Sequence, residues 1–169
     1  MKTYEDFLND LGARESNGKY NIENSLGYLG KYQFGNIALI DIGYKNKSGW
    51  TGKNGIYSKN DFLNNSKIQE LAIREYQKNT WKYIVSYNLH LYVGKVIKNI
   101  KITPSGLLAG YHLKGIGKSF KNIKRLSEKS KGLRCFLESN GVIDGKDGYG
   151  TSISEYIKKF SNYKTPFDI

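Results

Sequence analysis

The chain contains little cysteine, little histidine and no phosphate-binding glycine pattern. Cys135 is the only cysteine, so no disulfide can form within the chain. We expect Cys135, which lies between Arg134 and Phe136, to be a small buried hydrophobic residue. The only histidines, His90 and His112, lack the spacing of metal ligands and have no cysteine cluster beside them. We therefore expect no metal and no cofactor. The glycine-rich loop that cradles a nucleotide phosphate is also missing.

Long hydrophobic runs are absent as well. No apolar stretch approaches the roughly 20 residues that a membrane-spanning helix needs, and the mean hydropathy is −0.58. Residues 1–8 are amphipathic and carry acids where a signal peptide requires an apolar block. We therefore expect no membrane span, and synthesis in the cytoplasm without a recognisable signal peptide.

Acidic residues are scarce relative to basic ones, with 15 Asp and Glu against 27 Lys and Arg and a net charge of +12. The excess lies between Lys95 and Arg134, where Glu128 is the single acid. The basic residues there are Lys95, Lys98, Lys101, Lys114, Lys118, Lys121, Lys124, Arg125, Lys129, Lys131 and Arg134. Such a segment attracts polyanions such as nucleic acid, teichoic acid, acidic lipid or peptidoglycan carboxylates. A merely solvated surface explains the charge equally well.

A length of 169 residues suits one domain over 1–169. Apolar spacing and end signals predict a predominantly α fold of about seven helices with a small loop or β lobe over 18–32. The first helix begins after Thr3 and stops at Gly18. The others cover 34–42, 61–87, 104–114, 116–126, 133–137 and 153–160. Residues 44–57 are predicted to be a loop, and 89–102 suits either a strand or a short helix.

The most informative stretch begins with Glu15-Ser16 in the last turn of the first predicted helix. A loop rich in Tyr, Asn and Gly follows, with Gly27 and then Gly30-Lys31-Tyr32-Gln33. One carboxyl beside a polar, aromatic loop suits the cleavage of a glycosidic bond, which requires a proton on the leaving oxygen. A surface Glu15 paired with Arg14 or Lys19 is the plainer interpretation of the carboxyl alone.

This stretch resembles the lysozyme-like superfamily, and most closely its lytic transglycosylases, which cut bacterial peptidoglycan. Their signature is Glu-Ser, a Gly, and then Gly-Leu-Met-Gln. The spacing is kept here from Glu15 to Gln33, while Lys31-Tyr32 stands where Leu-Met is usual. The resemblance implies an α+β lysozyme-like fold with a cleft, and Glu15 as the catalytic acid. It also implies action at the cell wall or periplasm, reached by export, injection or lysis.

A second element, Leu108-Ala109-Gly110-Tyr111-His112, resembles the Ala-Tyr-Asn-Ala-Gly element of that family. In the family, its Tyr and Asn face the acid across the cleft. Tyr111 takes the place of the Tyr and His112 that of the Asn, although the closing Gly comes one position late. His112 is thus either a sugar ligand or a core histidine. The tail from Gly150 to Tyr156 also resembles phage and secretion-associated members.

A hydrolase of this kind usually needs a second carboxylate. Glu23 is the first candidate, because some lysozymes hold their second acid in the corresponding loop. Asp41, Glu70 and Glu75 are further candidates, although the last two belong to a helical charge pattern that favours solvated pairing. Lytic transglycosylases need no second acid, because one Glu acts first as acid and then as base while the muramic C6 hydroxyl attacks.

The leading hypothesis is thus a bacteriolytic enzyme, a lytic transglycosylase or muramidase, acting on a peptidoglycan glycan strand. Glu15 is the predicted acid, and the predicted substrate-binding residues are Ser16, Glu23, Tyr28, Tyr32, Gln33, Tyr111 and His112, with Trp50 as a further stacking candidate. The basic segment would hold an anionic wall polymer. Two alternatives are an inactive lysozyme-like glycan-binding module of a phage tail or secretion apparatus, and a helical nucleic-acid-binding domain. The latter lacks a recognised reading motif, so no specific nucleic acid is expected.

Overall fold

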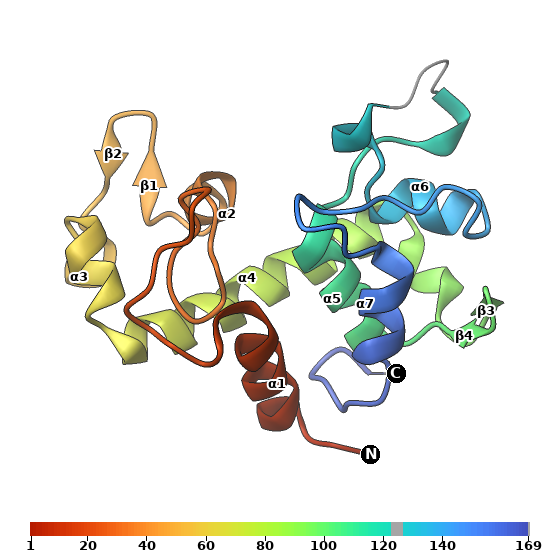
Figure 1. Cartoon of the computed structure of the whole chain (residues 1–169), viewed down its shortest axis with the longest axis horizontal. Helices are drawn as coiled ribbons and strands as arrows, with labels where there is room; N and C mark the ends of the chain where they lie inside the picture. Colours follow the sequence, from red (N-terminus) through yellow and green to blue (C-terminus); the bar gives the residue numbers. More distant parts are fainter. Residues whose placement is uncertain (123–126, 169) are drawn as a thin grey trace. The chain divides into compact units, whose positions relative to one another are not determined.

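The computed structural model describes residues 1–122 and 127–168. In these ranges seven α-helices form most of the regular structure, which confirms the prediction of a predominantly α fold. They are α1 (Tyr4–Ser16), α2 (Asn36–Asp41), α3 (Lys59–Leu63), α4 (Ser66–Ser86), α5 (Pro104–Lys114), α6 (Leu133–Glu138) and α7 (Ile153–Lys159) (Figure 1). Short 3-10 turns occupy Lys53–Gly55, Leu89–Tyr92, Phe120–Asn122 and Glu128–Ser130. None of the helices described is both long and apolar enough to span a bilayer.

Two antiparallel hairpins complete the regular structure of the described residues. In the first, β1 (Lys45–Asn46) pairs with β2 (Gly49–Trp50), so the prediction of a plain loop over 44–57 is wrong. In the second, β3 (Val96–Ile97) pairs with β4 (Ile100–Lys101). Its two turn residues, Lys98 and Asn99, both have positive φ, as a tight hairpin requires. The ambiguous segment 89–102 therefore contains both a helical turn and strands.

The chain forms two compact units. The inner unit comprises Leu8–Asn79, and the terminal unit comprises Met1–Phe7 with Thr80–Ile169. Both boundaries fall within helices, one in α1 and one in α4. That residues 1–169 form a single domain stays a prediction.

The terminal unit is built on close contact between α5 and α7. A Cβ atom added to Gly106 or Gly110 of α5 would lie 3.0 or 3.1 Å from the side chain of Ile157 on α7, so the two glycines allow the helices to approach. The buried apolar residues of this core are Ile84, Leu89, Ile97, Ile100, Ile102, Leu107, Leu133, Phe136, Leu137, Ile153 and Ile157. Cys135 is buried beside this core, as its sequence context predicts.

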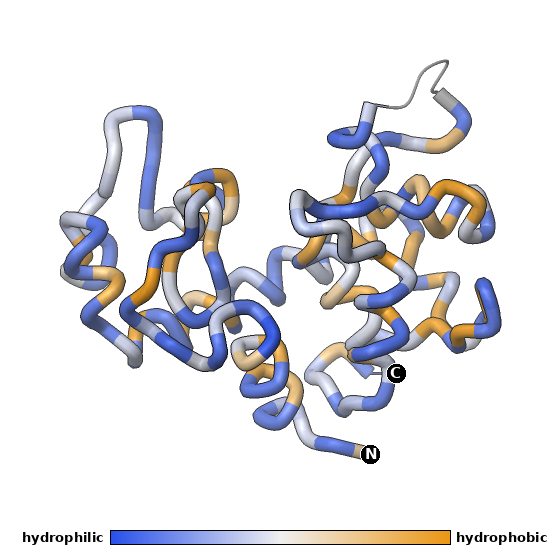
Figure 2. The backbone as a smooth tube through the Cα atoms, viewed as in Figure 1, coloured by the Kyte–Doolittle hydropathy of each residue, from blue (hydrophilic) through white to orange (hydrophobic). Residues whose placement is uncertain are grey.

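The inner unit has an aromatic core centred on Phe62 of α3. The ring of Phe62 lies 5.6 Å from that of Phe34, 5.8 Å from Trp50 and 5.9 Å from Tyr44, measured between centroids. Most of these contacts are edge-to-face, the arrangement that the ring quadrupole favours. Along α1, hydrophobic and hydrophilic residues alternate at helical spacing, visible as orange and blue bands on the tube in Figure 2.

Helix ends with strong local signals agree with the sequence. Thr3 Oγ1 accepts the N–H of Asp6 at 3.1 Å at the start of α1. Thr103 caps α5 in the same way, with Pro104 at the first helical position. Ser152 and Glu155 form the predicted capping box of α7.

Two helix predictions need correction. The single helix expected over 61–87 is divided into α3 and α4, because Asn65 Oδ1 accepts the N–H of Ile68 at 3.0 Å and starts a new helix. In the described part of the helix expected over 116–126, only the 3-10 turn at Phe120–Asn122 forms. Residues 123–126, which include two members of the basic segment, lie outside the described residues.

Candidate functional site

The end of α1 presents Glu15 beside a buried serine. Ser16 is 7% exposed, and its Oγ donates to the carbonyl oxygen of Lys31 at 2.7 Å. Asn17 then adopts a φ of 56°, and the N–H of Gly18 donates to Gly12 O at 3.1 Å, which closes the helix. Glu15 is therefore held in the last helical turn, partly exposed, directly before a residue fixed to the loop.

The second half of the motif is a tight turn over 30–33. Gly30 has a φ of 78° and Gln33 a φ of 56°. The backbone N–H and the Nε2 of Gln33 both donate to Gly30 O, at 3.2 and 2.9 Å. On either side, Leu29 and Phe34 exchange backbone hydrogen bonds. Gln33 thus stabilises the turn in which the Lys31 carbonyl oxygen accepts the Ser16 hydroxyl.

A buried amide on α4 explains why position 30 is glycine. Gln69 is fully buried, and its Oε1 accepts the backbone N–H of Lys31 at 2.9 Å. Its Nε2 donates to the carbonyl oxygens of Tyr20 and Phe62, at 3.0 and 2.9 Å. A Cβ atom on Gly30 would lie 2.2 Å from Gln69 Oε1. Only glycine leaves space for this amide at the positive φ that the turn requires.

A polar cluster, here called the Lys31–Glu70 cluster, lies next to this amide and comprises Asn9, Tyr20, Lys31, Tyr32 and Glu70. Lys31 Nζ donates to Glu70 Oε2 at 2.9 Å and to Asn9 Oδ1 at 3.0 Å. Glu70 also accepts the hydroxyls of Tyr20 at 2.8 Å and Tyr32 at 2.6 Å. A buried lysine needs a charged partner and further hydrogen bonds, and the partly buried Glu70 supplies that charge.

The cluster shifts the protonation of its members. Burial by itself would raise the pKa of Glu70, but the hydrogen bonds from Lys31, Tyr32 and Tyr20 outweigh it and hold the pKa below its ordinary value. Burial and the hydrogen bond to Glu70 raise the pKa of Tyr20 and, much further, that of Tyr32. Glu70 is therefore ionised and both phenols are neutral near neutral pH.

This shift predicts a specific dependence of stability on pH. The folded protein binds the Glu70 proton less readily than the unfolded chain, whose pKa is near 4.5. The stabilisation is thus complete above about pH 5 and is lost as the pH falls below 4.5 through the lowered folded value. We expect the free energy of unfolding of E70Q to be about 2 kcal/mol lower than that of wild type at pH 7, because Lys31 loses its charged partner.

Urea unfolding of wild type and E70Q between pH 3 and pH 7 measures this difference. Glutamine resembles the protonated acid, so the two curves are expected to converge at low pH. A difference that stays constant down to pH 3 would show that Glu70 keeps no depressed pKa.

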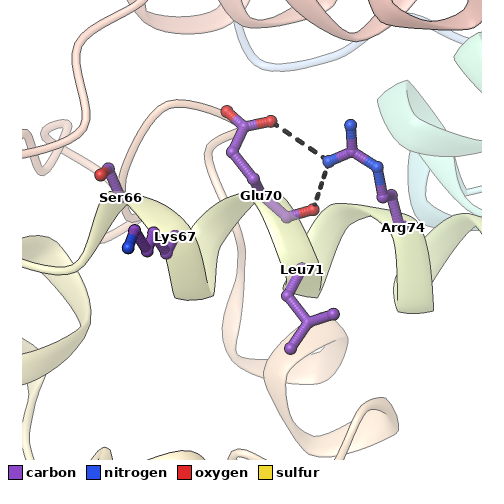
Figure 3. Close-up of a pocket in the computed structure, with 5 residues that line it drawn as sticks. All are labelled: Ser66, Lys67, Glu70, Leu71 and Arg74. Carbon is purple, nitrogen blue, oxygen red and sulfur yellow. Dashed lines mark hydrogen bonds and ion pairs between the residues drawn. The ribbon is translucent and has the colours of Figure 1, made fainter.

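An open cavity of about 370 Å³ lies along α4 next to the cluster. Figure 3 shows that Glu70 and Arg74 lie on one side of the helix and that Leu71 points away from them. Arg74 Nη1 donates to the Glu70 carbonyl oxygen at 2.9 Å and lies 3.6 Å from its carboxylate. The cavity is lined by Ser66, Lys67, Glu70, Leu71 and Arg74. Glu15 does not line it, so this cavity is distinct from the predicted catalytic position.

The loop over 24–28 presents an aromatic side chain to solvent. Asn24 Oδ1 accepts the N–H groups of Leu26 and Tyr28, both at 2.9 Å, and so shapes the loop. Tyr28 is 42% exposed, and its ring lies so close to Gly35 that a Cβ atom there would be 2.7 Å from the ring. Tyr28 is thus a fixed, exposed ring of the kind on which a sugar stacks.

Three other predicted contacts have different surroundings. Tyr32 is completely buried and uses its hydroxyl on Glu70, so it offers no exposed ring. Glu23 lies at the surface and pairs with Lys59, with Nζ 2.9 Å from Oε1. The half-buried ring of Trp50 packs on Phe62.

Tyr111 and His112 belong to α5 of the terminal unit. The ring of Tyr111 stacks on that of Tyr83, 6.3 Å apart and nearly parallel. His112 is half-buried. The structure therefore brings together Ser16, the turn over 30–33 and the first part of α4, with Gln69 and Glu70, within the inner unit. Tyr111 and His112 belong to the terminal unit.

Part of the basic segment is neutralised locally. Lys98 pairs with Asp144 at 3.3 Å, Lys131 with Glu128 at 3.2 Å, and Arg134 with Glu138 at 3.1 Å. Glu138 and Asp144 lie outside the segment in sequence. The net attraction for polyanions is therefore weaker than the count of basic residues alone indicates.

Sequence reasoning did not identify Asn9, Gly12, Tyr20 and Gln69 as parts of this site. One signal was available, because Gly12 interrupts a helical pattern in which alanine would be about 1 kcal/mol better. A Cβ atom there would lie 2.6 Å from Lys31 Cε, so this glycine admits the buried lysine. Nothing in the sequence marks Gln69 as a partner of a residue 38 positions away.

No protein-family model, curated protein or solved structure matches this chain.

Proposed function

We propose that the chain is a peptidoglycan-cleaving glycosidase with a lysozyme-like fold and glycan cleft. It would cut the β-1,4 bond between N-acetylmuramic acid and N-acetylglucosamine, with Glu15 as general acid and base. The observation that carries this proposal is the 2.7 Å hydrogen bond from Ser16 to Lys31 O. This bond joins the two halves of the motif, Glu15-Ser16 and Gly30 to Gln33, although 15 positions separate the bonded residues.

The proposed reaction uses the single carboxyl of Glu15 for both proton transfers. Glu15 in its acid form gives its proton to the glycosidic oxygen as the bond to the muramic C1 breaks. An oxocarbenium-like centre develops at C1. The Glu15 carboxylate then takes a proton either from the muramic C6 hydroxyl or from water, and the oxygen so activated forms the new bond to C1.

The candidates for a second carboxylate near the motif are already engaged, which favours attack by the C6 hydroxyl. Glu70 accepts hydrogen bonds from Lys31, Tyr20 and Tyr32. Glu23 is paired with Lys59 at the surface. A lytic transglycosylase uses one acid for both steps, and its product is a 1,6-anhydro sugar.

Substrate contacts come from the loop and, on the family resemblance, from α5. Tyr28 is the proposed stacking ring, because it is exposed and packed against Gly35. Ser16 and Gln33 hold the turn beside Glu15, while Tyr111 and His112 are proposed sugar ligands. The basic residues beyond Lys95 would attract the anionic wall polymer.

Mass spectrometry of the products tests the proposal. Purified peptidoglycan incubated with the wild-type protein is expected to release anhydro-muropeptides. Products with reducing ends would indicate a muramidase and direct attention to Glu23. If peptidoglycans of several wall types yield no products, the enzyme proposal fails, and the alternative of an inactive glycan-binding module is then tested by sedimentation with insoluble wall.

A further inference from the structure

Lys31 is a buried cation that is held by hydrogen bonds at its ammonium group and by packing along its stem. It is 6% exposed, and its Nζ donates to Glu70, Asn9 and Tyr20, the last at 3.4 Å. Its stem lies against Gly12, where any side chain would collide with it. Lysine is almost never buried without a charged partner, and Glu70 is the acid with which it pairs.

Glu70 binds several side chains of the loop that leads to the turn over 30–33. Its two carboxylate oxygens accept hydrogen bonds from the side chains of Tyr20, Lys31 and Tyr32, which span 13 positions of that loop. Its neighbour on α4, Gln69, holds the backbone of the same loop at Tyr20 and Lys31. Successive residues of one helix therefore fix both the side chains and the main chain of the loop.

The same lysine connects α4 to the catalytic position. Its side chain binds Glu70, and its carbonyl oxygen accepts the Ser16 hydroxyl, one residue after Glu15. A displacement of Lys31 would thus be transmitted to the last turn of α1. Reacting groups must be held closely, since a misplacement of about 1 Å lowers rates by about 10².

We propose that Glu70 is a positioning residue that holds Glu15 in its working orientation through Lys31 and Ser16. This inference rests on the proposed function of Glu15 as the acid. Glu70 itself is not proposed to touch substrate, because its carboxylate oxygens accept hydrogen bonds from the loop.

The test compares E70Q with E75Q at 25 °C. Glu75 lies on the same helix and forms an ion pair with Lys53 at 2.6 Å, but makes no contact with the loop over 20–33 in the hydrogen bonds and ion pairs that the structure describes. For a soluble oligomer of alternating N-acetylglucosamine and N-acetylmuramic acid, E70Q is expected to lower kcat by about 10–100-fold with KM changed by less than about 3-fold. E75Q is expected to leave both constants within about 2-fold of wild type.

The double variant K31M/E70Q separates positioning from folding. It removes the unpaired buried ammonium and keeps a side chain of similar length under Gly12, so its thermal midpoint is expected to return close to that of wild type. Its kcat is expected to remain about 10-fold low, because the links from Lys31 to Asn9 and Glu70 are gone. The double variant gives the same answer if E70Q does not fold.

Three outcomes would overturn the inference. Equal kcat values for E70Q and E75Q would do so, as would a kcat in K31M/E70Q that recovers fully with its stability, since Glu70 would then serve folding alone. These first two outcomes leave the proposed function intact. The wild-type protein is measured first. If it shows no turnover, the proposed function fails, and any catalytic role of Glu70 fails with it.

Discussion

Replacing Glu15 by glutamine is expected to lower turnover of peptidoglycan by about 10³-fold, within the range that a general acid or base contributes. Glutamine has nearly the same shape but cannot give a proton to the glycosidic oxygen. Glu15 is partly exposed at a helix end, so we expect E15Q to keep the thermal midpoint of wild type and its affinity for the glycan. The rate of muropeptide release and sedimentation with insoluble wall measure the two properties separately.

E23Q is the matched control for this prediction. Glu23 is the first candidate for a second catalytic acid and forms a surface ion pair with Lys59. Its loss is expected to change turnover by less than about 3-fold, since exposed pairs contribute little. If E15Q keeps the wild-type rate, Glu15 is not the acid. If both variants are inactive, Glu23 is a second catalytic carboxylate and the enzyme is a hydrolase.

Replacing Gly30 by alanine is expected to lower the free energy of unfolding by about 3 kcal/mol. A φ of 78° is strained for alanine, at about 1–3 kcal/mol. In addition, the new methyl group would lie 2.2 Å from Gln69 Oε1 and 2.7 Å from its Cδ. The buried amide must then move and leave the Lys31 N–H without its acceptor, which costs about 1–3 kcal/mol more.

G55A separates the two causes. Gly55 has nearly the same φ, 80°, in the same unit, but a Cβ atom there meets nothing within 4 Å. G55A therefore reports the backbone strain alone, about 1 kcal/mol. Urea unfolding of both variants is expected to show the larger loss for G30A. Equal losses would mean that Gln69 does not restrict position 30, and the explanation of the motif glycine would be wrong.

Structure determined by neighbouring residues could be predicted from the sequence. The starts of α1, α5 and α7 follow from Thr3, Thr103-Pro104 and Ser152, because a cap acts on N–H groups three residues away. The end of α1 at Ser16 follows from Gly18, because glycine readily adopts the positive φ that closes a helix. The position of Glu15 in the last helical turn follows from the same glycine.

Two other local features could not be predicted, because the sequence marks them weakly. The break between α3 and α4 depends on the cap at Asn65, which an apolar pattern running through the whole segment conceals. The β1–β2 hairpin consists of two residues on each strand, too few for an alternating pattern.

In the site, the contacts between distant residues could not be predicted. The motif spacing predicted that Glu15 and the turn over 30–33 belong together, but not what holds them. Tyr28 and Tyr32 look equivalent in sequence, yet one is 42% exposed and the other is fully buried against Glu70. Which ring faces inward depends on α4, about 40 positions further along the chain.

If Glu15 gives its proton to the glycosidic oxygen, its side chain must lie beside that oxygen in the bound glycan. This is best examined in a crystal structure of E15Q with an alternating oligomer of N-acetylglucosamine and N-acetylmuramic acid. We expect the glycosidic oxygen about 2.6–3.2 Å from the side chain of residue 15, the reach of a general acid. An oligomer bound with every glycosidic oxygen beyond the reach of that side chain, or no bound oligomer at saturating concentration, would contradict this role of Glu15.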